Sequence, residues 1–211
     1  MRSAEAENRA YFREAYLNGE HGWGVTEPDP FVVKYLARLR ELAPGGRLLD
    51  LGCGEGRHAI AGAGLGFRVT GVDFEPGALQ RARKAARAEG VRVTFRQADV
   101  RALPFPAGAF DAVLDYGCLH HQRQADWPAY RASLCQVLKP GGYYLLSVFS
   151  PRFRLFAGSQ RSWHIAHGAY RRCFTLEELV SMFKSDFEIL ELVEERPKGL
   201  WHALMRRRCA R

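Results

Sequence analysis

Short apolar runs alternate with amphipathic stretches along most of the chain. Runs of strand length lie at 47–51, 67–72, 92–96, 110–115 and 143–149. Stretches with helical spacing separate several of them, at 56–65, 76–89 and 127–138. Such alternation is typical of parallel strands joined by crossover helices that cover both faces of a sheet. The pattern therefore predicts an α/β fold with a Rossmann-like doubly wound sheet.

The last part of the chain predicts two further strands. Apolar runs at 187–193 and 200–206 are joined by a turn with proline and glycine, which indicates a closing hairpin. The basic triplet 206–208 at the end of this hairpin is expected to protect a strand edge with charge.

The N-terminal part predicts helices rather than strands. Residues 5–18 have helical periodicity, with Ala10, Tyr11, Ala15 and Leu17 expected near one another. A glycine- and proline-rich loop that carries Trp23 separates them from a second helical stretch. We expect one domain over 1–211, in which residues 1–42 form a helical cap.

The most specific local pattern is the segment 48–56, of sequence LLDLGCGEG. An apolar run here ends next to glycines at alternate positions, which allow the backbone to turn tightly against a ligand. The next apolar run ends at Asp73. In a doubly wound sheet, a carboxylate at the tip of the second strand binds the hydroxyls of a ribose. The two segments together predict a nucleoside-containing cofactor.

The glycine spacing distinguishes this site from a dinucleotide site. The dehydrogenase pattern is G-x-G-x-x-G, whereas this chain has Gly52, Gly54 and Gly56 followed by Arg57. The acidic Asp50 ahead of the glycines is poorly suited to a pyrophosphate and well suited to a cationic ligand. This combination, followed by an acidic strand tip at Asp73, resembles motifs I and II of the class I S-adenosylmethionine-dependent methyltransferases.

Three later segments resemble the same family in order and spacing: 97–100 (QADV), 110–121 (FDAVLDYGCLHH) and 138–148 (LKPGGYYLLSV). The segment 174–179 (FTLEEL) resembles a helix start of its small-molecule branch. The resemblance extends from about residue 45 to the C-terminus. It implies a seven-stranded, mostly parallel sheet with an antiparallel last strand.

The resemblance also implies a cofactor and the residues that bind it. The cofactor is S-adenosylmethionine, and its product after transfer is S-adenosylhomocysteine. The residues implied in its binding are Asp50, Gly52, Gly54, Asp73, Phe74, Asp99, Val100 and Asp115. Of these, Asp99 is expected at the adenine amino group and Val100 at the ring. Asp115 is expected at the methionine amino group, with a role as a strand-end cap as the alternative.

Methyl transfer from a sulfonium needs alignment more than acid catalysis, because the donor is already activated and leaves as a neutral group. A base is useful where the acceptor is a hydroxyl or a protonated amine. His120 and His121 follow the fourth strand and are the predicted catalytic residues. Tyr116 is a second residue that could orient the acceptor, with core packing as its alternative role.

Composition narrows the partners. The net charge of +8 raises the question of nucleic acid, but arginines on predicted helices favour a solvated outer surface. The segment 150–173, a candidate lid, contains arginines and no acidic residue, which favours an anionic acceptor.

Five cysteines without C-x-x-C spacing indicate reduced thiols and no metal site. Without a signal peptide or apolar span, we expect a cytoplasmic protein with no membrane contact.

These observations predict a methyltransferase that acts on a small, anionic molecule by in-line transfer. Two alternatives stay open: methylation of RNA or another macromolecule, and a noncatalytic protein that binds S-adenosylmethionine. The fourth strand ends in Asp115-Tyr116-Gly117-Cys118 rather than N-P-P-Y, which disfavours methylation of base nitrogens. The sequence does not identify the acceptor or the oligomeric state.

Overall fold

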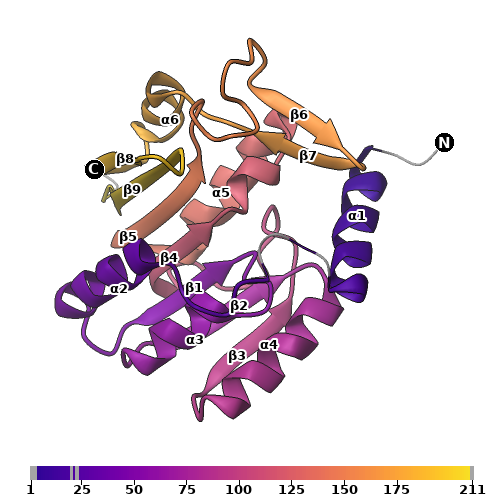
Figure 1. Ribbon diagram of the computed structural model, residues 1–211. Helices are drawn as coiled ribbons and strands as arrows, with labels where there is room; N and C mark the ends of the chain where they lie inside the picture. Colours follow the sequence, from indigo (N-terminus) through magenta and orange to yellow (C-terminus); the bar gives the residue numbers. More distant parts are fainter. Residues whose placement is uncertain (1–3, 20, 22–23, 210–211) are drawn as a thin grey trace.

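The computed structural model describes residues 4–19, 21 and 24–209, so Trp23 of the N-terminal loop lies outside the described residues. A seven-stranded sheet forms its centre, in the order β3-β2-β1-β4-β5-β9-β8 (Figure 1). The strands are β1 (Arg47–Leu51), β2 (Arg68–Asp73), β3 (Val93–Gln97), β4 (Phe110–Tyr116), β5 (Leu138–Phe149), β8 (Phe187–Glu195) and β9 (Leu200–Arg207).

The first five strands are parallel, and β9 is antiparallel to both β5 and β8. The predicted fold class is therefore confirmed. Strand β5 begins earlier than expected because its pairing with β4 contains an irregularity. Phe110 pairs with Leu138, and Ala112 already pairs with Tyr143. The Lys-Pro-Gly-Gly sequence is accommodated as a bulge rather than as a turn before the strand.

Helices cover both faces of the sheet. On one face lie α2 (Pro30–Leu42), α3 (Arg57–Gly64) and α4 (Pro76–Ala88), which share an apolar cluster with Leu48, Val69 and Leu114. On the other lie α5 (Trp127–Val137) and α6 (Leu176–Phe183), which pack with Leu49 and Val113. The crossover 98–109 between β3 and β4 contains no helix, so it adds no helical cover to this second face over β2 and β3.

Helix α1 (Ala4–Asn18) packs against α4 and against a small hairpin (Figure 1). It buries Phe12, Ala15 and Tyr16, whereas Leu17 is 75% exposed. The expectation that Leu17 groups with Ala15 on one apolar face is wrong, because the packed face is set by Phe12, which meets Phe74, and by Tyr16, which packs with α4. None of the helices in the described ranges is long and apolar enough to cross a membrane.

The segment 150–173 contains the small β-hairpin that packs against α1, which the sequence did not predict. Its strands are β6 (Trp163–Ala166) and β7 (Ala169–Arg172). Strand β7 contacts α1 and the short 3₁₀ helix η1 (Leu119–His121) that follows β4; a second 3₁₀ helix, η2, spans Gln124–Asp126. The triplet 206–208 does not protect a sheet edge, since β9 lies between two other strands. Instead, Arg207 donates to the Leu138 carbonyl.

Candidate active site

The glycine turn after β1 has a backbone that other residues rarely adopt. The φ angles of Gly52, Gly54 and Gly56 are 62°, 53° and 86°, all in the left-handed region. A Cβ atom on Gly54 would lie 2.8 Å from the Tyr16 hydroxyl, and one on Gly52 would lie 3.0 Å from Cys118 Cβ. The turn thus lies directly against α1 and the loop after β4, with no room for side chains.

Asp73 at the tip of β2 holds this turn in place. One carboxylate oxygen accepts from the Gly54 amide and the other from the Glu75 amide, both at 2.9 Å. Burial raises the pKa of Asp73 to about 6, and these two amides counteract the shift. Because a carboxylate has about four lone-pair sites, acceptor capacity remains for the hydroxyls of a ribose.

Asp50 is a buried carboxylate without a full set of partners. It is 2% exposed, and its Oδ2 has no hydrogen-bond partner among the described residues. Burial raises the pKa of Asp50 to about 8, and the charges of Asp115 and Asp73 add to this shift. Leaving such an oxygen unpaired is costly, so the position is suited to a cationic ligand group.

Asp99 and Val100 follow β3. Asp99 accepts from Arg101 at 2.6 Å and from Arg9 of α1 at 2.7 Å. The Arg101 hydrogen bond lowers the pKa of Asp99 to about 2, despite partial burial. Val100 is buried in the core next to it. The predicted adenine site therefore includes an ion pair with a helix about 90 residues away in the sequence.

Aromatic contacts complete the cover that α1 provides. The Phe12 ring meets Phe74 edge to face at 5.8 Å between centroids, and meets His121 at 4.9 Å. The Arg9 guanidinium lies 5.2 Å from the Phe74 centroid. Helix α1 therefore contacts the segments that follow β1, β2, β3 and β4 at their carboxyl ends. Phe12 and Arg9 were not predicted, since nothing local in the sequence indicates these partners.

Asp115 is fully buried at the end of β4. Its carboxylate accepts from the amides of Cys118 at 2.7 Å and Leu119 at 3.0 Å, and from the Tyr130 hydroxyl at 2.5 Å. Burial raises its pKa to about 7. These contacts are those of a strand-end cap that fixes the loop before His120. A contact with the methionine amino group stays a prediction.

The two predicted catalytic histidines lie in that loop with their rings 4.5 Å apart. His120 stacks on Phe149 at 3.7 Å, and its Nδ1 has no partner in the described part of the chain. His121 Nδ1 lies 2.7 Å from the Tyr170 carbonyl, which requires that Nδ1 carries the proton. Burial lowers the pKa of His121 to about 4 and that of His120 well below its usual range. Both rings are neutral at pH 7, as a general base must be.

Two of the five arginines of the segment 150–173 make ion pairs within the described residues. Arg152 pairs with Glu194 at 3.1 Å, and Arg172 pairs with Glu178. Arg171 makes no ion pair within the described residues and donates to the Tyr11 hydroxyl at 2.8 Å. Its positive charge contributes to the low pKa values of both histidines. Arg171 is therefore the guanidinium of this segment that faces the predicted catalytic residues with its charge uncompensated.

A polar network that the sequence did not indicate lies beside the glycine turn. Asp29 accepts from the Tyr116 hydroxyl at 2.9 Å and from Lys198 at 3.3 Å, while its own amide donates to His58. It joins the N-terminal loop, β4 and the β8–β9 turn. The Pro-Asp-Pro sequence suggests only a helix cap, which Asp29 also provides.

This part of the chain is similar to known proteins. A sequence profile described as "Methyltransferase domain" matches residues 48–142, which hold the glycine turn and the acidic positions after it. An uncharacterized methyltransferase of Schizosaccharomyces pombe is 34% identical over 118 residues, covering 54% of this chain and 81% of that protein. The chain belongs to the class I S-adenosylmethionine-dependent methyltransferases. The predicted family, its enzyme class and its cofactor are confirmed at this level.

Two further known proteins are similar to this chain. Demethylmenaquinone methyltransferase of Thermus thermophilus is 42% identical over 108 residues, which is 50% of this chain and 48% of that protein. The match to this methyltransferase thus spans about half its length. A solved structure of Burkholderia thailandensis 1,6-didemethyltoxoflavin-N1-methyltransferase, with 1,6-didemethyltoxoflavin and S-adenosylhomocysteine bound, superposes with a TM-score of 0.76 at 26% identity. The superposition covers 97% of this chain and 89% of the chain of the toxoflavin enzyme.

Proposed function

We propose that this protein transfers the methyl group of S-adenosylmethionine to a small-molecule acceptor and releases S-adenosylhomocysteine. The observation that carries the proposal is the unpaired, buried carboxylate of Asp50 beside a glycine turn with left-handed backbone. A cationic nucleoside cofactor meets both requirements. The named relatives methylate demethylmenaquinone and 1,6-didemethyltoxoflavin, which supports a small acceptor.

The residues that would hold the cofactor follow from their positions. Asp50 compensates its positive charge, and Asp73 binds the ribose hydroxyls while keeping Gly54 in place. Phe74 and Val100 supply apolar surface for the adenine, and Asp99 supplies an acceptor for its amino group. Gly52 and Gly54 allow the backbone to approach. Asp115 acts through the loop that it caps and faces the methionine end.

The bound cofactor supplies an activated methyl group, so the chain's own contribution is alignment. Asp115 fixes the loop that carries His120 and His121 through the amides of Cys118 and Leu119. His121 donates through Nδ1 to Tyr170, which leaves Nε2 as the nitrogen able to accept the proton of an acceptor hydroxyl. His120, stacked on Phe149, has an unprotonated nitrogen of its own.

The surface proposed for the acceptor has a column of stacked aromatic rings and one positive charge without an ion-pair partner. His120 stacks on Phe149 at 3.7 Å, and Phe149 stacks on Phe153 at 3.9 Å. A planar acceptor ring would pack on this column. Arg171 supplies the positive charge that favours an anionic group on the same molecule, by the fork geometry of its guanidinium. The hairpin β6–β7 acts as the lid over this acceptor, and the helices before residue 42 form the cap of a single cytoplasmic domain.

Isothermal calorimetry with S-adenosylhomocysteine, and with NAD as the control ligand, tests the cofactor. Binding of the former alone supports the proposal, and a preference for NAD contradicts it. Product formation is then measured with planar hydroxylated aromatic acids and with their uncharged esters. Turnover of the acids alone supports the anionic acceptor. Tight cofactor binding without turnover on any acceptor would favour the noncatalytic alternative, and transfer to RNA the macromolecular one.

A further inference from the structure

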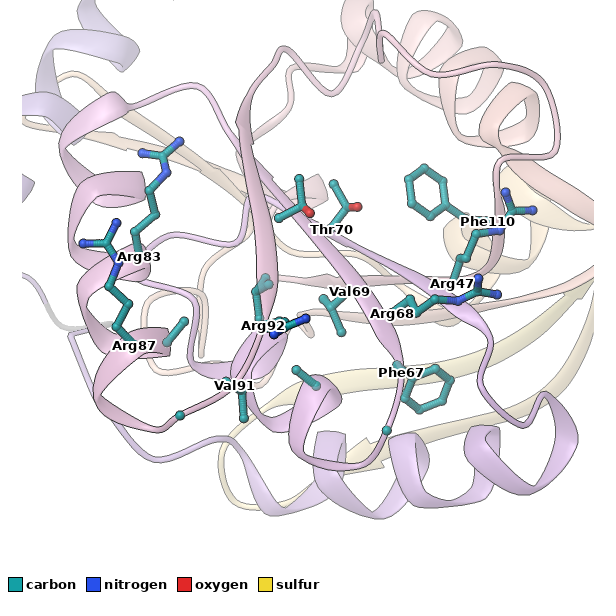
Figure 2. A pocket seen from close by; sticks show the side chains of 16 residues that line it. Arg47, Phe67, Arg68, Val69, Thr70, Arg83, Arg87, Val91, Arg92 and Phe110 are labelled. Carbon is teal, nitrogen blue, oxygen red and sulfur yellow. The ribbon is translucent and has the colours of Figure 1, made fainter.

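A second charged site lies at the amino ends of β1, β2 and β3, the opposite end of the strands from the glycine turn. A cavity of about 930 Å³ opens there, and five arginines line it (Figure 2). They are Arg47, Arg68, Arg83, Arg87 and Arg92. No acidic residue is among the lining residues. We call this cavity the arginine groove.

Three of these arginines form a row across neighbouring strands. Arg47 of β1 is in register with Arg68 of β2, and Val69 is in register with Val93. Arg92, which precedes Val93, is therefore level with Arg68. Adjacent strands lie about 4.8 Å apart, so three guanidinium side chains start side by side on one face of the sheet. Like charges placed this way repel one another.

The next row along the same face is polar. Thr70 and Thr94 are in register, and Thr94 is exposed. This part of the sheet is open because the crossover 98–109 forms no helix over β2 and β3. The hydroxyls therefore lie beside the arginine row, where they can donate to an anionic oxygen. Figure 2 shows Arg92 between Arg83 and Arg87 of α4 and the pair Arg47 and Arg68.

The chain neutralises little of this charge. Arg68 donates to the Gly45 carbonyl at 3.2 Å and Arg83 to the Phe95 carbonyl at 2.9 Å, both neutral acceptors. Arg87 and Arg92 make no ion pair with any described residue. Arg47 approaches Asp111 at 3.7 Å, but that carboxylate also pairs with Lys139. The groove therefore carries a net positive charge that an anionic ligand would offset.

The arginine groove is poorly suited to guarding a sheet edge, to pairing with a second copy of the chain or to binding a membrane. Protection of the sheet edge needs charge only on β3, whereas Arg47 and Arg68 belong to inner strands. A second copy of the chain would bring one arginine row against another. A membrane surface usually engages basic residues together with exposed apolar ones. The groove has none, since Phe67 and Phe110 in its lining are both 5% exposed.

We propose that the arginine groove binds the sugar–phosphate backbone of single-stranded nucleic acid. A row of guanidinium groups and hydroxyls matches a chain of phosphates, and these are the side chains that usually contact them. The groove presents no exposed aromatic ring on which bases could stack, so it would contact the phosphates alone, and such contacts are independent of sequence. Since the groove is at the far end of the strands, this polymer is a partner of the protein and not its methyl acceptor.

The test is fluorescence anisotropy with a labelled oligouridylate of about 12 nucleotides, a length within the range of such grooves. The wild-type chain is titrated at several salt concentrations between about 50 and 200 mM. The variant R68E/R92E reverses two charges of the row. The matched control R40E/R208E reverses two exposed arginines outside the groove. Thermal melts and S-adenosylhomocysteine binding establish that both variants are folded.

We expect wild-type affinity to fall with salt at a logarithmic slope of about −2, since each of three neutralised phosphates contributes about −0.7. R68E/R92E should lose at least tenfold in affinity and flatten this slope, whereas R40E/R208E should stay within about threefold of wild type. Equal losses in the two variants would overturn the proposal, because they would mean that general charge attraction is sufficient for binding. The proposal is also overturned if the wild-type chain does not bind the oligouridylate. It is overturned as well if the chain binds phosphatidylserine vesicles instead of RNA, with the same dependence on Arg68 and Arg92.

Discussion

Arg9 of α1 donates to Asp99 after β3 at 2.7 Å, and this pair joins the N-terminal helix to the predicted adenine site. Arg13, which also belongs to α1, lies 3.5 Å from the carboxylate of Glu75. Both carboxylates follow strands at their carboxyl ends. The helix is thus held over the site by ion pairs at its rim, together with the Phe12 ring inside.

The Arg9 pair should control how long the cofactor product stays bound. Both side chains are partly exposed, so the Arg9→Ala change should cost at most about 1 kcal/mol, or roughly fivefold in the dissociation rate of S-adenosylhomocysteine. Stopped-flow dissociation gives this rate, and hydrogen exchange of residues 4–18 reports helix opening. Arg40→Ala, on the exposed side of α2, is the control. An unchanged rate with unchanged exchange would show that the pair does not hold the helix.

Asp50→Asn should change stability and binding in opposite directions. Removing the unpaired charge should stabilise the ligand-free protein by about 1 to 3 kcal/mol at pH 8 and above. The pKa of Asp50 is raised from 3.8 to about 8, so the folded state binds the proton more tightly than the unfolded chain. The destabilisation of the folded wild-type protein by the Asp50 charge is therefore absent below pH 4 and grows until about pH 8.

Thermal melts of both proteins across this pH range measure that difference, which should widen as pH rises. S-adenosylmethionine should bind the Asn variant at least tenfold more weakly, because a charge-assisted contact is lost. A variant that binds as tightly as wild type would contradict the role of Asp50 as the partner of the cationic cofactor.

Asp73→Ala should weaken S-adenosylhomocysteine binding by about 1.5 to 3 kcal/mol, through loss of hydrogen bonds to a charged acceptor. It also leaves the Gly54 and Glu75 amides without their partner. Calorimetry of the variant, with adenine alone as a ligand that lacks ribose, separates the two effects. The ribose assignment is abandoned where the variant keeps its affinity for S-adenosylhomocysteine.

His121→Gln should lower kcat by about 10² to 10⁴ where the acceptor is a hydroxyl, with cofactor affinity unchanged. Because the pKa of His121 is lowered to about 4, the base is protonated only in strong acid. Wild-type activity should thus stay level from pH 8 down to about pH 5, without the fall near pH 6.5 of an ordinary histidine. His120→Gln is the matched comparison. A loss of less than tenfold in both would assign transfer to alignment alone.

Much of the arrangement that we assign to the cofactor could be predicted, because it depends on short-range patterns. The carboxyl ends of parallel strands meet at one edge of a sheet, so Asp50, Asp73 and Asp99 had to lie near one another once the strands were recognised. The tight turn followed from glycine spacing, and the structure gives Gly52 and Gly54 the backbone angles expected.

The cover of the site could not be predicted in this way. The packed face of α1 contains Phe12 and Tyr16 rather than Leu17, because the choice is made by distant residues such as Phe74 and His121. The hairpin β6–β7 lies in a segment without clear strand alternation. Its position is set by contacts with η1 and α1, which no local pattern records.

The position of Tyr16 has a consequence for the order of events in a catalytic cycle. Its hydroxyl lies where a side chain on Gly54 would be, directly over the turn that we assign to the cofactor. A nucleoside bound at that turn would lie under α1, so we expect S-adenosylhomocysteine to leave only after this helix moves aside. Methyl transfer itself needs no such motion, so a first turnover can be fast and later ones slow. The protein would then show a burst of product equal to its active sites, followed by a steady rate that measures the opening of one helix.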